Sequence, residues 1–261
     1  MLPDQTFSTI VGDKEIVFKT GKLAEQAGGA VSAQMGDCIV LATATMSKHV
    51  REGLDFFPLS VDFEEKMYAA GRIPGGFFRR EGRPTTEAIL ASRLTDRPLR
   101  PLFPDGMRNE VQIIMTTLSS DSIHHLDILA LNAASAALHI SDAPWDGPIG
   151  AVRVAYIDGE LVAAPTIPQM ADSTLDLRLA GTKDAIIMVE AGANEVDEAL
   201  LVEALAFGHE AIQPIIATIE EMRDAVGKPK RDVDFAVEDE ELAAAVRERL
   251  GNRLPEIVAQ F

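Results

Sequence analysis

Short β-rich segments joined by tight turns constrain this chain more than any other feature. FSTIV and KEIVFKT flank Gly12-Asp13, and a second such pair flanks Asp158-Gly159. Two-residue turns of this kind join antiparallel strands into hairpins. The sequence predicts a third hairpin around residues 181–184 and further strands at residues 37–47, 59–64 and 110–118. Much of the chain must therefore lie in sheets with antiparallel pairs.

Three helices are predicted among these strands, at residues 86–96, 126–140 and 196–226. The last has apolar residues at helical spacing, and Gly227 and Pro229 end it. Pro214 lies inside it and predicts a kink or a break. Short strand signals thus alternate with these helical stretches, and we expect an α+β fold, with mixed β-sheets and helices packed on them.

After Pro229 the sequence is charged, helical and without strand signals. Residues 238–250 have the spacing of an amphipathic helix, ended by Gly251-Asn252. We therefore expect residues 1–229 to form one domain. Residues 230–261 then form the truncated beginning of an all-α domain.

Composition limits the remaining classes. Apolar residues make up 47% of the chain but aromatics only 5%, so the core is aliphatic. No run approaches the length of a membrane span, and the first residues lack the features of a signal or transit peptide. We expect a soluble, cytoplasmic protein with no membrane partner. Cys38 is expected as a buried thiol, Trp145 as a core residue and His209 as a hydrogen-bonded helix residue.

Positive charge gathers in one segment of an acidic chain. The net charge is −17, yet residues 71–103 hold seven arginines, no lysine and three acids. Arginine grips phosphate with two parallel hydrogen bonds, so this pattern suggests placed phosphate contacts. The alternative is a set of structural ion pairs. Arg93 and Arg97 are four apart on the helix predicted from Thr86, which Leu90 and Leu94 would anchor in the core and Pro98 would end.

The sequence GRIPGGFFRREGRP places Phe77, Phe78, Arg79 and Arg80 together in a loop. Single-stranded nucleic acid offers flat bases for aromatics and phosphates for arginines, so this loop has both kinds of contact. An open alternative is a hydrophobic staple, with a phenylalanine tucked into the body or into a subunit interface. The predicted RNA-binding set is Phe77, Phe78, Arg79, Arg80, Arg83, Arg93, Arg97 and Arg100.

The stretch AAGRIPGGFFRREGRPTTEAILASRLTDRPLRPLFP closely resembles the first ribonuclease PH-like domain of the bacterial polynucleotide phosphorylase family. LDFFPLSVDFEEKMYAAG, NAASAAL, WDGPIGAVRVAYIDG and VEALAFGHE extend the resemblance over residues 5–229. The resemblance implies a ribonuclease PH-like fold followed by the start of a helical linker. It also implies a phosphate-dependent 3′→5′ exoribonuclease that degrades single-stranded RNA to nucleoside diphosphates. Its members are homotrimeric rings, and a loop like residues 77–80 lines the central channel. No DNA partner is expected.

The resemblance also implies that Mg²⁺ and inorganic phosphate act in a second domain outside this chain. Here Asp176 falls where the active domain has a metal carboxylate, but its partner position holds Met170. A thioether does not bind a hard cation. His124, His125 and Asp127 precede the helix where a phosphate-binding serine cluster would lie, and we expect an exposed polar turn there. We predict no catalytic residue and no metal site in this chain, with Asp176 vestigial. The alternative function is a non-catalytic ribonuclease PH-like module that binds RNA or builds a ring.

Overall fold

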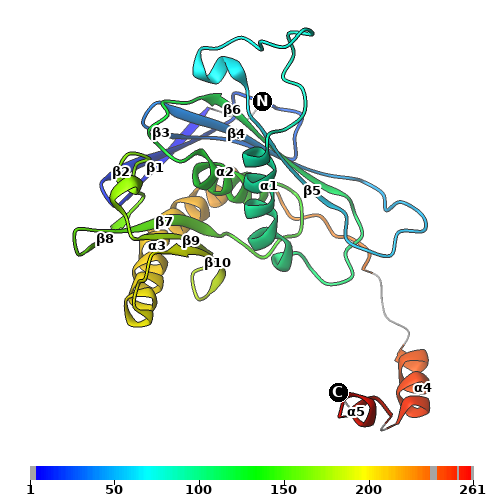
Figure 1. Ribbon diagram of the computed structural model, residues 1–261. Helices are drawn as coiled ribbons and strands as arrows, with labels where there is room; N and C mark the ends of the chain where they lie inside the picture. Colours follow the sequence, from blue (N-terminus) through cyan, green and yellow to red (C-terminus); the bar gives the residue numbers. More distant parts are fainter. Residues whose placement is uncertain (1–3, 236–239, 252, 260–261) are drawn as a thin grey trace.

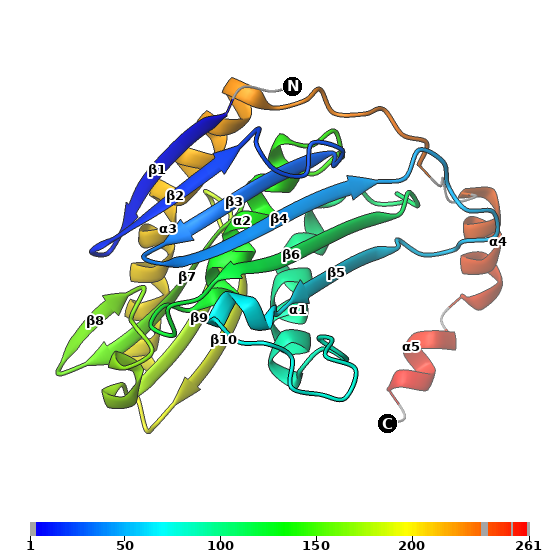
Figure 2. The ribbon, with the colours of Figure 1, turned by 90° about the horizontal axis from the view of Figure 1, so that it is seen from above.

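Two β-sheets enclose a helical layer in the computed structural model, which describes residues 4–235, 240–251 and 253–259. The larger sheet has six strands in the order β1-β2-β3-β4-β6-β5, and the smaller has four in the order β10-β9-β7-β8. Figure 1 shows helix α2 between the two sheets, and Figure 2 shows the six-stranded sheet from above. The predicted α+β fold is confirmed.

The hairpins form where the turn residues predict them. β1 (Gln5–Val11) pairs antiparallel with β2 (Lys14–Thr20), with Val11 opposite Lys14. The turn gives Gly12 a φ of +62°, and a Cβ there would lie 2.7 Å from the carbonyl oxygen of Ala163. Glycine is therefore required both for the backbone angle and for the close approach. β7 (Gly150–Ile157) and β8 (Glu160–Ala163), and β9 (Leu175–Gly181) and β10 (Ile186–Ala193), form the other two predicted hairpins.

The strands predicted at residues 37–47, 59–64 and 110–118 are β4 (Cys38–Met46), β5 (Leu59–Glu64) and β6 (Val111–Ser119). β3 (Gly29–Met35) was not predicted, because its GAVSAQM sequence is rich in small residues with low strand propensity. It forms because it lies between β2 and β4, which satisfy both of its edges. β5 runs parallel to β6, and the chain between them carries η1 (Met67–Ala70), α1 (Thr86–Leu99) and η2 (Arg100–Leu102).

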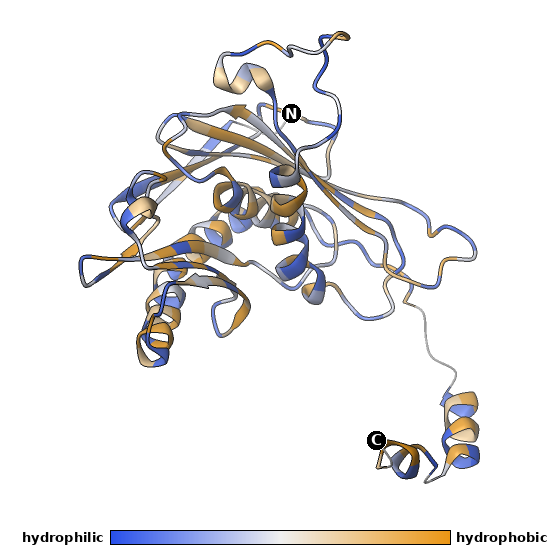
Figure 3. Cartoon of the chain, in the orientation of Figure 1, coloured by the Kyte–Doolittle hydropathy of each residue, from blue (hydrophilic) through white to orange (hydrophobic). Residues whose placement is uncertain are grey.

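Helix α2 (Leu126–Ile140) is the centre of the core. Every residue from Ile128 to Ile140 is buried, and the helix packs against β3, β4, β7 and α3. Its small alanine side chains let the helix backbone approach β3 closely. A Cβ on Gly29 of β3 would lie 2.0 Å from the carbonyl oxygen of Ala137. Two buried polar side chains fasten it to the start of β7: Asn132 bonds the backbone of Ala151, and Ser135 bonds that of Ile149. Figure 3 shows the hydrophobic colouring on α2 and on the strands that face it.

The structure of α1 differs from the prediction in two ways. The helix does not end before Pro98 but continues to Leu99, and the N–H of Arg100 still bonds the carbonyl of Asp96. A proline so near the end removes only its own hydrogen bond, so the last turn survives. Leu90 is 59% exposed, and the face toward the core is made by Ala88, Ala91, Leu94 and Thr95. The expectation that Leu90 anchors the helix was wrong.

Helix α3 (Glu198–Val226) runs without a break through Pro214, so the predicted interruption does not occur. Glu210, whose carbonyl loses its usual donor, lies on the exposed side, where water can bond it. By length and composition alone α3 is the one helix of the described residues that could cross a membrane. Its buried residues recur every three or four positions and pack on β1, β7, β9 and α2, which is typical of a core helix. His209 on α3 bonds the carbonyl of Thr182 at 3.0 Å, as expected for a helix residue with a partner.

The chain after α3 is fastened to the body as far as Arg231. Lys228 Nζ donates to the carbonyl of Gly28 at 2.6 Å, and Lys230 Nζ donates to the carbonyls of Leu138, His139 and Ser141 at the end of α2. α4 (Glu240–Leu250) and α5 (Arg253–Val258) lie apart from the body (Figure 1). The helix predicted at residues 238–250, with its end at Gly251-Asn252, includes residues 238, 239 and 252, which lie outside the described residues. The domain boundary near residue 229 stays a prediction.

Candidate nucleic-acid interface

The loop between η1 and α1 carries two aromatic rings into solvent. Phe77 is 95% exposed and Phe78 is 82% exposed, and the two rings meet edge to face with centroids 5.4 Å apart. The loop stands out from the six-stranded sheet (Figure 1). A tight turn forms its tip, where the N–H of Arg79 donates to the carbonyl of Gly76 at 2.9 Å. A staple into the chain's own body is therefore excluded, and a staple into a subunit interface stays open.

The structure divides the seven arginines of residues 71–103 into two groups. Arg97 Nη2 lies 3.0 Å from Glu190 of β10, and Arg100 makes a two-pronged ion pair with Asp96. Arg100 also donates to the carbonyls of Phe57 and Leu59 and lies over the Phe57 ring, so its position is structural. In the part of the chain that the structure describes, no ion pair or hydrogen bond engages the guanidinium groups of Arg72, Arg79, Arg80, Arg83 and Arg93.

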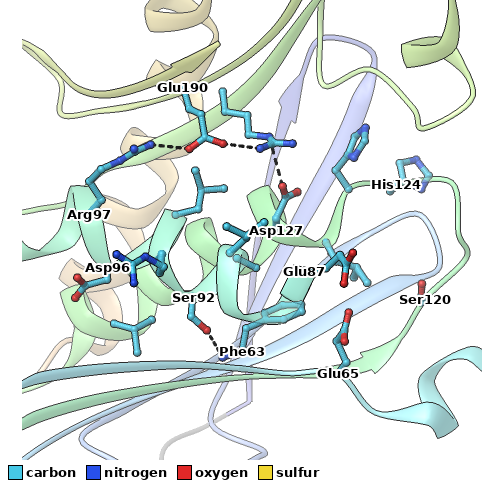
Figure 4. A pocket seen from close by; sticks show the side chains of 18 of the residues that line it. Phe63, Glu65, Glu87, Ser92, Asp96, Arg97, Ser120, His124, Asp127 and Glu190 are labelled. Carbon is cyan, nitrogen blue, oxygen red and sulfur yellow. Dashed lines mark hydrogen bonds and ion pairs between the residues drawn. The ribbon is translucent and has the colours of Figure 1, made fainter. Parts of the chain in front are cut away.

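An open cavity of about 1420 Å³ separates α1 from the smaller sheet. α1 contributes Leu90, Arg93 and Arg97 to one wall, and Arg178 and Glu190 lie on the other. Figure 4 shows Glu190 between two guanidinium groups, bonded to Arg97 at 3.0 Å and to Arg178 at 2.7 Å. Arg93 is thus the arginine of α1 that reaches this cavity without a carboxylate partner among the described residues.

The carboxylate that resembles a metal ligand is already occupied. Arg153 donates to Asp176 through Nε at 2.7 Å and through Nη2 at 2.6 Å, and Arg178 Nη2 lies 3.6 Å away. The guanidinium group of Arg153 therefore occupies the position from which a metal ion would neutralise Asp176. Met170, in η3 (Gln169–Asp172), offers only a thioether. Asp176 and Met170 therefore do not make a site suited to Mg²⁺, which the family resemblance places in a domain outside this chain.

The two histidines ahead of α2 do not form an exposed turn. Both are partly buried, and Arg153 Nη1 lies 2.7 Å from His125 Nδ1. Burial, helped by the charge of Arg153, lowers the pKa of His125 to about 4, so its ring is neutral and accepts the hydrogen bond. Asp127 lies 3.7 Å from Arg178. The expected exposed polar turn was wrong, because β7 and β9 bring arginines to this corner that the local sequence does not contain.

Sequence reasoning also missed a cluster around Cys38. Its Sγ lies 3.1 Å from Asp121 Oδ1, and His124 Nδ1 lies 2.6 Å from Asp121 Oδ2. Cys38 is fully buried, which confirms the predicted buried thiol, and this burial raises the pKa of the thiol to about 11. Burial alone would raise the pKa of Asp121, but hydrogen bonds from the N–H groups of His124 and Ile123 and from both side chains hold it well below its usual range. The side chains of Cys38, Asp121 and His124 are thus hydrogen-bonded to one another.

Comparison with known proteins defines the class of this fold. The model of the 3′ exoribonuclease family, domain 1, matches residues 12–144, and that of domain 2 of the same family matches residues 147–211. The chain belongs to the 3′ exoribonuclease family. Two solved structures share the fold: a chain of the Archaeoglobus fulgidus exosome with RNA bound to the active site, and rice Rrp46. The first has 19% identity and a TM-score of 0.59 over 76% of this chain and 85% of that one. The second has 16% identity and a TM-score of 0.62 over 84% and 93%.

More similar sequences narrow the family further. The polyribonucleotide nucleotidyltransferase of Heliobacterium modesticaldum is 53% identical over 96% of this chain and 35% of its own length. The enzymes of that name from Anaeromyxobacter dehalogenans and Roseiflexus castenholzii are 53% and 54% identical over 95% and 94% of this chain. The chain spans about a third of the length of these relatives. The resemblance found in the sequence is confirmed.

Proposed function

We propose that this chain is the RNA-guiding part of a phosphate-dependent 3′→5′ exoribonuclease of the polynucleotide phosphorylase type. The whole protein would degrade single-stranded RNA, mRNA included, to nucleoside diphosphates in the cytoplasm. The naming of its relatives as polyribonucleotide nucleotidyltransferases supports this reaction class. Inorganic phosphate is the co-substrate, and Mg²⁺ would be held in the part of the protein that lies outside this chain.

One observation carries the role of this part. Phe77 and Phe78 are almost fully exposed at the tip of a loop whose arginines have no partner in the described residues. Water-exposed phenylalanine rings stay costly until something covers them, and unpaired guanidinium groups remain free for phosphates. A single strand supplies bases for the rings and phosphates for Arg79, Arg80 and Arg83. Arg93 extends these contacts toward the cavity beside α1.

Catalysis would not take place in this chain. The phosphorolytic step needs a bound phosphate and a metal ion to stabilise developing negative charge. Here Asp176 is engaged by Arg153, and Asp127, which pairs with Arg178, puts a carboxylate where the family resemblance would place the phosphate-binding serines. The site is vestigial in this proposal. The same ion pair favours a second candidate function, a non-catalytic ribonuclease PH-like module that binds RNA or builds a ring.

A homotrimeric ring is part of the proposal. Ile89 and Leu90 of α1 are 49% and 59% exposed, Leu90 at the wall of the open cavity, and β5 is an edge strand of the larger sheet. Apolar side chains next to an open strand edge are typical of surfaces that become covered in an assembly.

The test is phosphate-dependent degradation of poly(A), measured for this chain alone and for the protein extended to the length of its relatives. The proposal expects nucleoside diphosphates only from the extended protein. If the extended protein binds poly(A) but releases no nucleoside diphosphate, the non-catalytic module is the better description.

A further inference from the structure

The exposed loop is held by few contacts. A Cβ added at Gly71, Gly75, Gly76 or Gly82 would meet no atom within 4 Å, so the loop does not pack on the body. The rings of Phe77 and Phe78 contact each other. A loop without a packed core is flexible unless hydrogen bonds restrain it. What restrains this loop therefore decides how its rings and guanidinium groups are presented.

One carboxylate ties the returning limb of the loop to the body. Glu81 accepts the N–H of Met67 with both oxygens, at 3.1 and 3.3 Å. Within residues 72–84, all of which the structure describes, this is the only side chain that hydrogen-bonds to the rest of the chain. Met67 begins η1, and η1 is fixed to the sheet because the N–H of Ser120 donates to the carbonyl of Ala69.

The N-terminus of η1 suits a carboxylate as hydrogen-bond acceptor. The N-terminal N–H groups of a helical turn have no partner within the turn and favour negative charge. Lys66, the residue before η1, makes no side-chain cap, so Glu81 supplies the missing acceptor from fourteen residues away. The pKa of Lys66 is raised, first by its hydrogen bond to Glu64 and in smaller part by the charge of Glu81. The Lys66 ammonium thus attracts the Glu81 carboxylate, although Glu64 is its main partner.

The direction of Glu81 has a second consequence. Three arginines surround it in sequence, at positions 79, 80 and 83, and each of them offers a guanidinium group with which a carboxylate can pair. Here the carboxylate points to a backbone N–H instead, and no described residue pairs with those three guanidinium groups. Glu81 therefore restrains the loop without neutralising the groups that the loop presents.

We propose that Glu81 is a positioning residue for RNA binding: its carboxylate caps η1 and holds the loop so that Phe77, Phe78 and the arginines face one strand together. This inference rests on the proposed RNA-guiding function. The positioning role predicts a change in RNA affinity opposite to the change expected from charge alone. Removing a negative charge beside an RNA site should strengthen binding by electrostatics alone, whereas removing a positioning residue should weaken it.

The experiment compares Glu81→Ala, Glu81→Gln and Glu87→Ala in the full-length assembled protein. Glu87 is the matched control, because it is an exposed glutamate six residues further on whose carboxylate has no hydrogen bond or ion pair in the described residues. The first measurement is hydrogen exchange of residues 72–84 without RNA. The second is the affinity for an oligo(A) strand over a series of salt concentrations.

We expect Glu81→Ala to raise exchange in the loop and to weaken oligo(A) binding about threefold to tenfold, with the salt slope unchanged. Glu81→Gln keeps an acceptor oxygen without the charge and should fall between. Glu87→Ala should bind as tightly as the parent or more tightly. If Glu81→Ala matches Glu87→Ala in affinity, or if exchange of the loop stays unchanged, the positioning role is wrong.

A fourth variant separates this proposal from the function on which it rests. Replacing Phe77 and Phe78 by Ala should weaken oligo(A) binding if the loop contacts RNA. If it does not, the RNA-guiding function fails and the positioning role fails with it. If the Phe variant weakens binding but Glu81→Ala does not, the function stands and only the role of Glu81 is overturned.

Discussion

Arg153 of β7 and Asp176 of β9 lie diagonally across the two paired strands and form a two-pronged ion pair, with donor–acceptor distances of 2.7 and 2.6 Å. The two residues come from neighbouring strands of one sheet, twenty-three positions apart. An internal cation therefore neutralises the carboxylate that a metal would need. This relationship supports the proposal that phosphorolysis takes place outside this chain.

The first prediction concerns this ion pair. Manganese should not bind this chain with useful affinity, because Asp176 is engaged by Arg153 and Met170 offers no hard ligand. Calorimetric titration with Mn²⁺ is the measurement. Stoichiometric binding that disappears in Asp176→Asn would contradict it.

The second prediction is that this chain alone does not phosphorolyse RNA. The purified chain should release no nucleoside diphosphate from poly(A), whether or not phosphate and magnesium are present. A protein extended to the length of its relatives serves as the positive control. Phosphate- and magnesium-dependent release by the chain itself would show that the site is not vestigial.

The third prediction separates stacking from charge at the loop. In the assembled protein, replacing Arg79 and Arg80 by Ala should weaken RNA binding. It should also flatten the slope of log affinity against log salt concentration by about 0.7 for each phosphate that the variant no longer binds. Replacing Phe77 and Phe78 should cost roughly 1–3 kcal/mol per stacked base and leave the salt slope nearly unchanged. If the Phe variant leaves RNA binding intact but destabilises the trimer, the loop is an interface staple.

The fourth prediction contrasts two arginines of the same segment. Arg93→Ala should reduce RNA affinity and salt slope as a loop arginine does, because its guanidinium has no partner among the described residues. Arg100→Ala should instead lower the free energy of unfolding by about 1 kcal/mol, since Arg100 bonds Asp96 and two carbonyls. Chemical denaturation and RNA titration of both variants are the measurements. An Arg100 variant that loses RNA affinity without losing stability would return Arg100 to the binding surface.

The fifth prediction is a dependence of stability on pH. Burial, helped by the charges of Lys230 and Arg223, lowers the pKa of His139 to about 4, and its Nδ1 has no partner among the described residues. His139 takes up a proton near pH 6.5 in the unfolded chain and only near pH 4 in the folded chain. Its contribution to the free energy of unfolding is therefore complete above pH 6.5 and is lost as the pH falls toward 4. The loss is about 2 kcal/mol by pH 5. Denaturant unfolding at pH 8 and pH 5 tests this, and His139→Phe should show a smaller drop.

What the sequence determined by itself is local. The turns at Gly12 and at Asp158-Gly159 specify their hairpins because only a few residue types adopt the required backbone angles. The apolar run of α2 predicts its bounds, and Trp145 is 6% exposed with its N–H bonded to the carbonyl of Leu99, as a core tryptophan requires. The run of aromatics and arginines at residues 77–80 predicted an exposed loop.

Only the tertiary structure decided which polar groups are free. Arg97 and Arg93 lie one turn apart on α1 with the same sequence signal, yet β10 brings Glu190 to Arg97 and no described carboxylate pairs with Arg93. β3 became a strand because two neighbours satisfy its edges, and Leu90 faces solvent because alanines make the close contact with the sheet. Charge pairing, strand pairing and the choice of buried face each depend on residues far apart in the chain. No local pattern carries that information, since the partner arrives only when the two sheets close around α2.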